Sequence, residues 1–311
     1  MRHSLPLAMK QHLITIKEFQ NKFPDDATCL AHLFAQEFPN PKCDKCGKVG
    51  QFSQNTNRAC FSCSCGQSHI YPKAGTIFEK SSTSLHDWFY AIFLMSVSRN
   101  GVACRELQRH IGVTLKTAYR MQKQIRTMMQ ELPPYMSGEV EADETMVGGK
   151  RKGRRGRGAA GKTVVFGKLE RGTKRVTTAI VPNVKAATLL PHFNDSVAKG
   201  TKLITDELKS YRKIANIVEM DHDTVNHGSG QYVKGTTHTN TIENFWGQLK
   251  RSLDGTHHVI SPKWLHLYVS EFAFRYNHRL VPVPMFDLLL SRVSYMTTQV
   301  GRRIGSYQWP V

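Results

Sequence analysis

The pattern of apolar and polar positions in residues 238–251 has the period of an α-helix. Glu243 and Lys250 are two helical turns apart, so both side chains project from one side of this predicted helix. Thr239 or Asn240 can cap its first turn, because a short polar side chain accepts a hydrogen bond from an unpaired backbone N–H. The apolar stripe of the helix consists of Ile242, Phe245, Trp246 and Leu249.

Upstream of this helix, two short apolar alternations read as strands that run into polar loops, and they lead to Asp143 and Asp206. Carboxylates from two strand ends and one helix would form an oxygen-rich site for a hard divalent cation. Spacing alone does not separate such a site from ordinary surface acids. The nearby acids that remain alternatives are Glu141, Glu144, Glu207 and Asp221.

The chain after Pro133 and Pro134 predicts an α/β domain with a mixed sheet covered by helices. The two prolines end the preceding helix and mark a domain boundary. Another strand is predicted near the apolar residues Ile214, Ile217 and Val218. The other predicted segments are strands over residues 139–147, 162–171 and 175–182, a helix over 185–199 and a central strand over 203–207.

Helical periods dominate the first 130 residues, both within residues 1–40 and from Ser84 until Asn100 and Gly101 stop the pattern. A short helix, a turn containing Gly112 and a basic helix follow, which is the order of a helix-turn-helix whose second helix enters the DNA major groove. The basic residues of that second helix are Lys116, Arg120, Lys123 and Arg126.

Charge narrows the class of partner. With 43 Lys and Arg against 24 Asp and Glu, the net charge is +19, which favours a polyanion because each phosphate contact releases counterions. A glycine-rich basic segment between the first two strands, residues 148–162, should attract phosphates. Its predicted DNA-contacting residues are Lys150, Arg151, Lys152, Arg154, Arg155 and Arg157.

Membrane binding is disfavoured, because no apolar run approaches the roughly 20 residues that span a bilayer and no basic amphipathic helix is evident. The first residues lack a long apolar segment followed by a small-residue cleavage site. We therefore expect a cytoplasmic protein.

Five of the seven cysteines lie between residues 43 and 65, in the sequences CDKC and CFSCSCG. Thiolate pairs separated by a short hairpin suit a tetrahedral zinc ion, and a cytosolic chain is not expected to use them as structural disulfides. Spacing alone favours Cys60 with Cys63 as the second pair. His69 is a further candidate ligand.

Several distinct motifs follow one another along the chain: AGTIFEKSSTSLHDWFYAIFLM, TAYRMQKQIR, EADETMVGGK, KTVVFGKLER, ITDELKSY, YVKGTTHTNTIENFWGQLKR and EFAFRYNHR. Taken together and in this order, they resemble the bacterial DDE-type insertion-sequence transposases of the ISXO type. That family carries a zinc ribbon and a helix-turn-helix ahead of a ribonuclease-H-like catalytic domain.

The resemblance implies a metal-binding triad of Asp143, Asp206 and Glu243, with Lys250 as the basic residue after the last acid. Two Mg²⁺ or Mn²⁺ ions held there would support cleavage and transfer of DNA strands by in-line displacement. For the structural zinc, the CSCG motif favours Cys43, Cys46, Cys63 and Cys65, with Cys60 as the alternate.

The implied organisation is a helical segment over residues 1–40, a zinc ribbon over 41–80, a helix-turn-helix region over 81–134, a ribonuclease-H-like DDE domain over 135–290 and a tail over 291–311. The implied partners are the terminal inverted repeats of the element and target DNA, bound by a homo-oligomer in the bacterial nucleoid. Two rivals are a DNA-binding regulator without catalysis and a ribonuclease-H-like nuclease or resolvase.

Overall fold

The computed structural model describes residues 13–148, 162–194, 196–225 and 237–300. The chain forms two compact units. The first combines Met1–Met128 with Leu280–Val311, and the second is Met129–Arg279. The predicted basic loop residues Lys150, Arg151, Lys152, Arg154, Arg155 and Arg157 lie outside the described residues.

The first unit is a group of helices that share an aromatic core. Phe19 and Phe23 contact Phe286, with ring centroids 5.8 and 5.7 Å apart, and Phe89 and Phe93 lie against the same ring. Because Phe286 belongs to this core, the chain from Leu280 onward groups with the N-terminal helices. The helices are α1 (Ile16–Lys22), α2 (Asp26–Glu37), α3 (Leu85–Val97), α4 (Cys104–Ile111), α5 (Leu115–Met128) and α11 (Met285–Val300).

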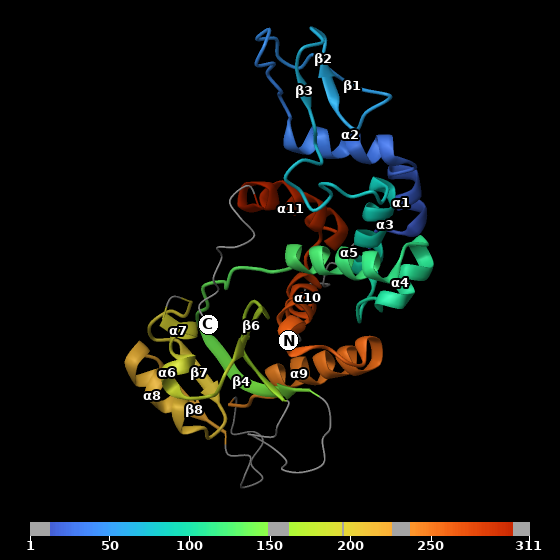
Figure 1. Cartoon of the computed structure of the whole chain (residues 1–311). Coiled ribbons are helices and arrows are strands. Elements are labelled where there is room, and N and C mark those ends of the chain that lie inside the picture. Colours follow the sequence, from blue (N-terminus) through green and yellow to red (C-terminus); the bar gives the residue numbers. More distant parts are fainter. Residues whose placement is uncertain (1–12, 149–161, 195, 226–236, 301–311) are drawn as a thin grey trace, which may run out of the picture. The chain divides into compact units, whose positions relative to one another are not determined.

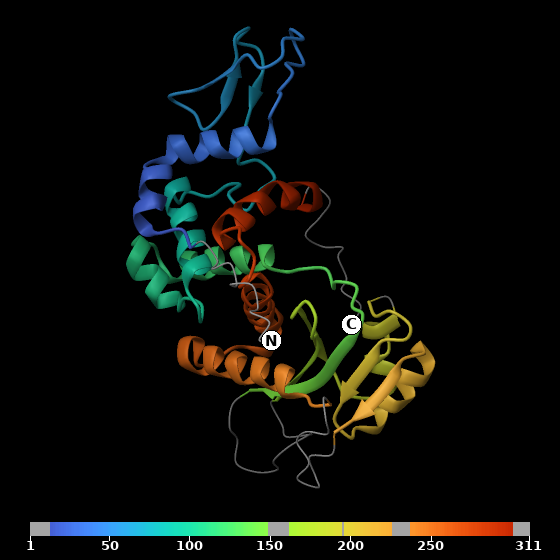
Figure 2. The same cartoon turned by 180° about the vertical axis from the view of Figure 1, so that it is seen from behind.

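Between α2 and α3, a small antiparallel sheet has the order β1-β2-β3 and lies beside α2 (Figures 1 and 2). Phe34 of α2 stacks on Phe61 of the central strand, with ring centroids 3.8 Å apart. So small a sheet buries little apolar surface of its own, so that it needs α2 as a support. Its strands are β1 (Phe52–Gln54), β2 (Phe61–Cys63) and β3 (His69–Ile70).

The second unit is built on a five-stranded mixed sheet of order β6-β5-β4-β7-β8. β5 runs antiparallel to both of its neighbours, β4 and β6, whereas β7 runs parallel to β4 and β8 runs parallel to β7. This is the mixed α/β sheet expected of a ribonuclease-H-like domain. The strands are β4 (Glu139–Val147), β5 (Thr163–Glu170), β6 (Val176–Val181), β7 (Lys202–Thr205) and β8 (Asp221–Thr224).

Helices cover both faces of this sheet (Figures 1 and 2). On one face, Val140, Ala142 and Leu203 pack with buried residues of α8 such as Tyr211. On the other, Val165 and Leu169 pack with the buried stripe of α9 and with α10. The apolar stripe predicted for α9 is buried as expected. The helices are α6 (Ala186–Leu189), α7 (Pro191–Asn194), α8 (Lys209–Val218), α9 (Asn240–Ser252) and α10 (Leu265–His278).

Two local predictions were wrong. The helix over residues 185–199 is two short helices that meet at Pro191, which lacks the N–H that a continuous helix would need. The strand predicted near Ile214 and Val218 is the helix α8, and the strand is β8. Ile217 is 60% exposed, because the helical period of α8 turns it away from the core.

No helix in the described part of the chain is long and apolar enough to cross a membrane.

Gly167 of β5 sets how closely α9 can approach the sheet. A Cβ atom added there would lie 2.6 and 2.7 Å from two ring carbons of Trp246. We expect Gly167→Ala to lower the free energy of unfolding by about 1–3 kcal/mol, because a tightly packed core does not accept an added methyl group without strain. Urea denaturation followed by tryptophan fluorescence measures this change.

Gly172→Ala is the matched control, since a Cβ atom at Gly172 meets nothing within 4 Å. It should change the free energy of unfolding by no more than about 0.5 kcal/mol. Equal effects of the two substitutions would show that the contact with Trp246 does not limit the packing of α9.

Candidate active site

Strand register brings Asp143 and Asp206 toward one another. In the parallel pair of β4 and β7, Val140 is opposite Leu203 and Glu141 is opposite Ile204. Continuing this offset by two residues aligns Asp143 with Asp206, which directly follows β7. Because side chains alternate along strands, both aspartates belong to the sheet face that α9 covers.

α9 packs on the sheet beside the position of Asp143. Gly167 is the partner of Asp143 in the antiparallel pair of β4 and β5, and it lies under Trp246 and Ile242 of α9. Glu243 follows Ile242 at the exposed margin of this helix, and its Oε1 accepts a hydrogen bond of 2.6 Å from Thr239 Oγ1. The three predicted acids therefore come from β4, the end of β7 and the first turn of α9.

The electrostatics of Asp143 report the proximity of the other acids. Burial, the charge of Glu144 and the charges of Asp206 and Glu243 raise the pKa of Asp143 to about 7, and the backbone N–H of Glu144 only partly opposes them. A divalent cation bound beside these acids would favour the charged form of Asp143, because opposite charge lowers the pKa of a carboxyl.

Among the described residues, the group of side chains with the geometry of a metal site is a group of cysteines, and the three predicted acids do not form such a group. Their oxygen donors, drawn from three different elements, fit Mg²⁺ or Mn²⁺.

The four other acids that sequence spacing left as alternatives to the triad differ from it in their contacts and exposure. Glu144 points to the opposite face of the sheet, where it accepts a hydrogen bond of 2.8 Å from Tyr211. Glu141 is fully buried and bonded to α9. Glu207 and Asp221 are exposed. Asp143 differs from these acids in its surroundings, because burial, Glu144, Asp206 and Glu243 raise its pKa.

Lys250 lies in the last turn of α9 and is exposed, as the two-turn spacing from Glu243 predicts. The hydrogen bond that caps the first turn of this helix differs from the prediction. Thr239 is the N-cap residue, but its side chain makes no capping hydrogen bond. The acceptor at the first turn is instead Glu141 of β4, which binds the N–H of Ile242 at 2.9 Å.

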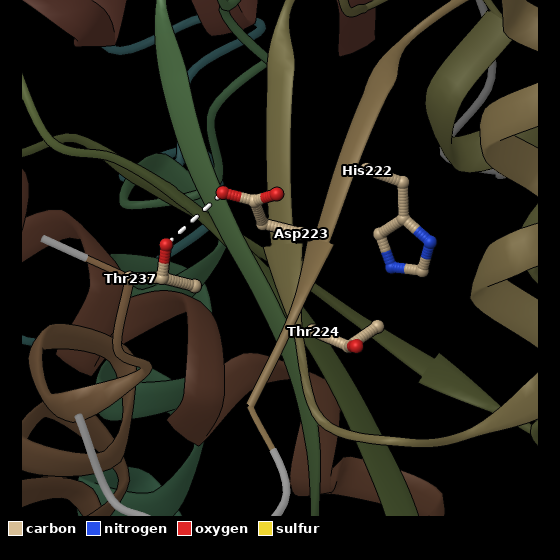
Figure 3. A pocket seen from close by; sticks show the side chains of 4 residues that line it. All are labelled: His222, Asp223, Thr224 and Thr237. Atoms are coloured by element: carbon tan, nitrogen blue, oxygen red, sulfur yellow. Dashed lines mark hydrogen bonds between the residues drawn. The ribbon is translucent and has the colours of Figure 1, made fainter. Parts of the chain in front are cut away.

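Near the end of β7, a small polar pocket of about 240 Å³ is lined by residues of β8 and by Thr237 (Figure 3). Asp223 accepts a hydrogen bond of 3.0 Å from Thr237, and His222 points away from it toward the other side of β8. His222 Nε2 lies 2.9 Å from Thr205 Oγ1, whose neighbour is Asp206. The pocket contains none of the predicted triad residues.

The cysteines between residues 43 and 65 gather around one point. The four sulfur atoms of the cysteines that the CSCG motif favours all lie within 4.8 Å of one another. Cys60 is buried but is not a member of this group, and His69 is bonded to Ser62 at 2.9 Å. The positive φ of the glycines that follow each pair, 72° and 74°, lets the backbone turn sharply around the group. The group consists of Cys43, Cys46, Cys63 and Cys65.

The helices α4 and α5 are joined by a turn at Gly112, which has a left-handed φ of 75°. Thr114 accepts a hydrogen bond of 3.2 Å from the N–H of Thr117 and so caps α5. The exposed basic residues of α5 form a surface beside Tyr119, whereas Arg126, predicted to contact DNA, is 2% exposed and is not part of that surface. The residues of this α5 surface are Lys116, Tyr119, Arg120 and Lys123.

The sequence analysis did not identify three features: the close approach of α9 at Gly167, the cap that Glu141 provides for α9, and the ion pair between Arg171 and Glu141. One signal was available for the first of these, because an isolated glycine inside a predicted strand often marks the close approach of another element. The other two depend on contacts between residues that are far apart in the chain, which spacing does not report.

Solved structures with some similarity to the chain are viral integrases. The catalytic core of BIV integrase is 12% identical, with a TM-score of 0.30 over 43% of this chain and 81% of that one. The HTLV-2 integrase catalytic core in complex with magnesium is 9% identical, with a TM-score of 0.28 over 45% of this chain and 86% of that one.

Sequence similarity is more specific. The model of the ISXO2-like transposase domain matches residues 135–277. A transposase-like protein of Haemophilus influenzae is 34% identical over 104 residues, which are 33% of this chain and 82% of that protein. A protein of the transposable element ISH50 of Halobacterium salinarum is 30% identical over 220 residues, which are 65% of this chain and 73% of that protein. The chain therefore belongs to the family of ISXO2-like insertion-sequence transposases.

Proposed function

We propose that this protein cleaves the ends of an insertion sequence and joins them to target DNA by metal-dependent phosphoryl transfer. The proposal is supported above all by strand register, which aligns Asp143 with Asp206 on the sheet face where α9, the helix of Glu243, packs. Burial and the charges of Glu144, Asp206 and Glu243 raise the pKa of Asp143 to about 7. Family membership supports transposition, and the carboxylates supply the chemistry.

Asp143, Asp206 and Glu243 would hold the divalent ions. Two such ions, when bound, activate a water or a DNA 3′-hydroxyl and stabilise the leaving oxygen of an in-line displacement. Burial and the neighbouring acids raise the pKa of Asp143 to about 7, and a bound cation would lower it again, because a carboxylate ligand must be deprotonated. Lys250 is exposed and would compensate phosphate charge in the bound DNA.

Recognition of the element would fall to the first unit. The exposed basic face of α5, which follows a glycine turn, fits the second helix of a helix-turn-helix in the major groove. The four clustered cysteines would bind one zinc ion and hold the small sheet folded. The terminal inverted repeats, target DNA and a homo-oligomeric working complex are part of this proposal.

Two other functions remain distinguishable by experiment. A DNA-binding regulator would need the charge and the N-terminal helices but not three acids around one position of a sheet. A nuclease or resolvase would cut DNA without joining it to a new target. Covalent joining of labelled element ends to target DNA separates transposition from both alternatives.

The triad assignment predicts the effect of removing one charge. Glu243→Gln keeps the shape of the side chain but removes the charge that binds a cation, so strand cleavage should fall about 10³-fold or more. Asp143→Asn and Asp206→Asn should act in the same way, and the double variants should lose little more, because the three residues act as one unit. Cleavage of labelled element ends in Mn²⁺ measures the loss.

Glu207→Gln is the control for charge, because Glu207 adjoins Asp206 but is exposed. This variant should cleave at close to the wild-type rate. Binding of DNA without metal should be unchanged in every variant. The assignment is wrong if Glu243→Gln cleaves normally while its DNA binding is intact.

The zinc assignment predicts about one zinc ion per chain in protein purified under reducing conditions without chelator, since one tetrahedral site takes one ion. Cys63→Ser should lose this zinc, because it removes one of the four clustered thiols. Cys60→Ser, which alters a buried cysteine outside the cluster, should keep it. Elemental analysis measures the zinc content. If Cys63→Ser kept the zinc and Cys60→Ser lost it, Cys60 and not Cys63 would be the zinc ligand.

The exposed face of α5 predicts a salt-dependent effect. Replacing Lys116 and Lys123 by Gln should weaken DNA binding and reduce the slope of log K against log salt by about 2, since each phosphate contact contributes nearly one. Fluorescence anisotropy over a series of salt concentrations measures the slope. Lys17→Gln, an exposed change on α1, is the control. An unchanged slope in the double variant would exclude α5 from the phosphate contacts.

A further inference from the structure

The first turn of α9 is held by a residue of the sheet. The initial N–H groups of any helix lack partners within it, and a side chain at the N-cap usually accepts one of them. Here Thr239 occupies the N-cap, but its hydroxyl donates to Glu243 instead of accepting. The capping function is therefore open to a side chain from another element.

Glu141 of β4 performs this capping function. Its side chain is fully buried, and its Oε2 accepts a hydrogen bond of 2.9 Å from the N–H of Ile242. Its Oε1 accepts another of 2.8 Å from Thr241 Oγ1. A carboxylate at this end of a helix also interacts favourably with the helix dipole. The contact joins β4 to the turn of α9 that carries Glu243.

Arg171 orients the buried carboxylate of Glu141. Its Nε donates to Glu141 Oε1 at 2.7 Å, and its Nη1 donates to Glu139 at 3.0 Å. Its Nη2 donates to the backbone carbonyl of His238 at 2.6 Å. One guanidinium thus connects β4 with the segment that enters α9, and this pairing offsets the cost of burying the Glu141 charge.

The same segment is attached to the sheet at a second point. Thr237 donates a hydrogen bond to Asp223 of β8 (Figure 3). The carboxylate of Asp223 also pairs with Lys202 of β7 at 3.0 Å. Residues 237–242 are therefore bonded to three strands or their ends, through Asp223, Glu141 and Arg171. Apolar packing fixes the distance of α9 from the sheet, whereas these polar contacts fix its position along the sheet.

We propose that Glu141, oriented by Arg171, is a positioning residue that sets the place of Glu243 relative to Asp143 for metal binding. Glu141 precedes Asp143 by two positions on the same face of β4, and Glu243 is one residue beyond Ile242, which Glu141 caps. A shift of this cap would move Glu243 with the first turn of its helix. The inference rests on the proposed triad.

Glu141 is not itself a metal ligand in this arrangement. Its two oxygens accept hydrogen bonds from Arg171, Thr241 and Ile242, and the side chain has no exposed surface. Direct binding of a cation would require that these bonds break and that Arg171 move away from its partner. The role of Glu141 is therefore exerted through α9.

The test compares Glu141→Gln with Glu139→Gln in the full-length, zinc-containing chain. Both residues lie on β4 and accept a hydrogen bond from Arg171, but Glu141 is the one that caps α9. The Mn²⁺ concentration for half-maximal cleavage should rise at least about tenfold in Glu141→Gln, the usual cost of losing a partner that orients a metal ligand. It should stay within about twofold of wild type in Glu139→Gln.

A direct measurement of Mn²⁺ binding, by electron paramagnetic resonance of the free ion, separates positioning from general stability. Glu141→Gln should weaken binding in the wild-type background but cause no further loss in the Glu243→Gln background, because the two residues act through one ligand. Loss of thermal stability or cleavage without any change in Mn²⁺ dependence would overturn the inference.

Thr241→Val tests the same contact if Glu141→Gln does not fold. This substitution removes one donor to Glu141 but keeps the buried charge paired with Arg171. It should raise the Mn²⁺ requirement in the same direction by about threefold, and an unchanged requirement would again overturn the inference. Normal Mn²⁺ binding and cleavage in both Asp143→Asn and Glu243→Gln would instead refute the proposed triad.

Discussion

The close packing of α9 on β4 and β5 is the constraint on which the candidate active site depends. Trp246 fills the space above Gly167, and Gly167 is the register partner of Asp143, so the helix is nearest to the sheet where the first acid lies. A larger residue at Gly167 would separate the two elements. Apolar packing thereby determines the distance between carboxylates that would otherwise repel one another.

The periodic parts of this unit were predictable from the sequence because burial acts on every second residue of a strand and on every third or fourth residue of a helix. Val140 and Ala142 face one core, and the stripe of α9 faces the other, as their spacing indicates. The same reasoning failed at α8. Ile214 and Val218 are one helical turn apart, and the helix is evident only when Tyr211 and Ala215 are included in the pattern.

The identity of the functional acid on β4 was less accessible to sequence reasoning. Glu141 and Asp143 carry the same charge and lie on the same face of β4, so the alternation of side chains along a strand cannot distinguish them. They differ in partners from distant segments: Glu141 meets Arg171 and the start of α9, whereas Asp143 meets the charges of Asp206 and Glu243. A carboxylate paired within the fold has a structural role, whereas a carboxylate beside further acids can bind a cation.

Glu141 comes from β4, and this explains why its buried carboxylate caps α9 although Thr239 already occupies the N-cap position. A side chain at Thr239 could satisfy an N–H of α9, but both groups would move together with the helix and would not fix its place on the sheet. A cap from β4 connects the helix to the strand that carries Asp143, so the two predicted ligands share one reference point. With Glu141 as the acceptor, the hydroxyl of Thr239 is available to donate to Glu243. The cap thus stabilises the helix and also orders the acid that follows it.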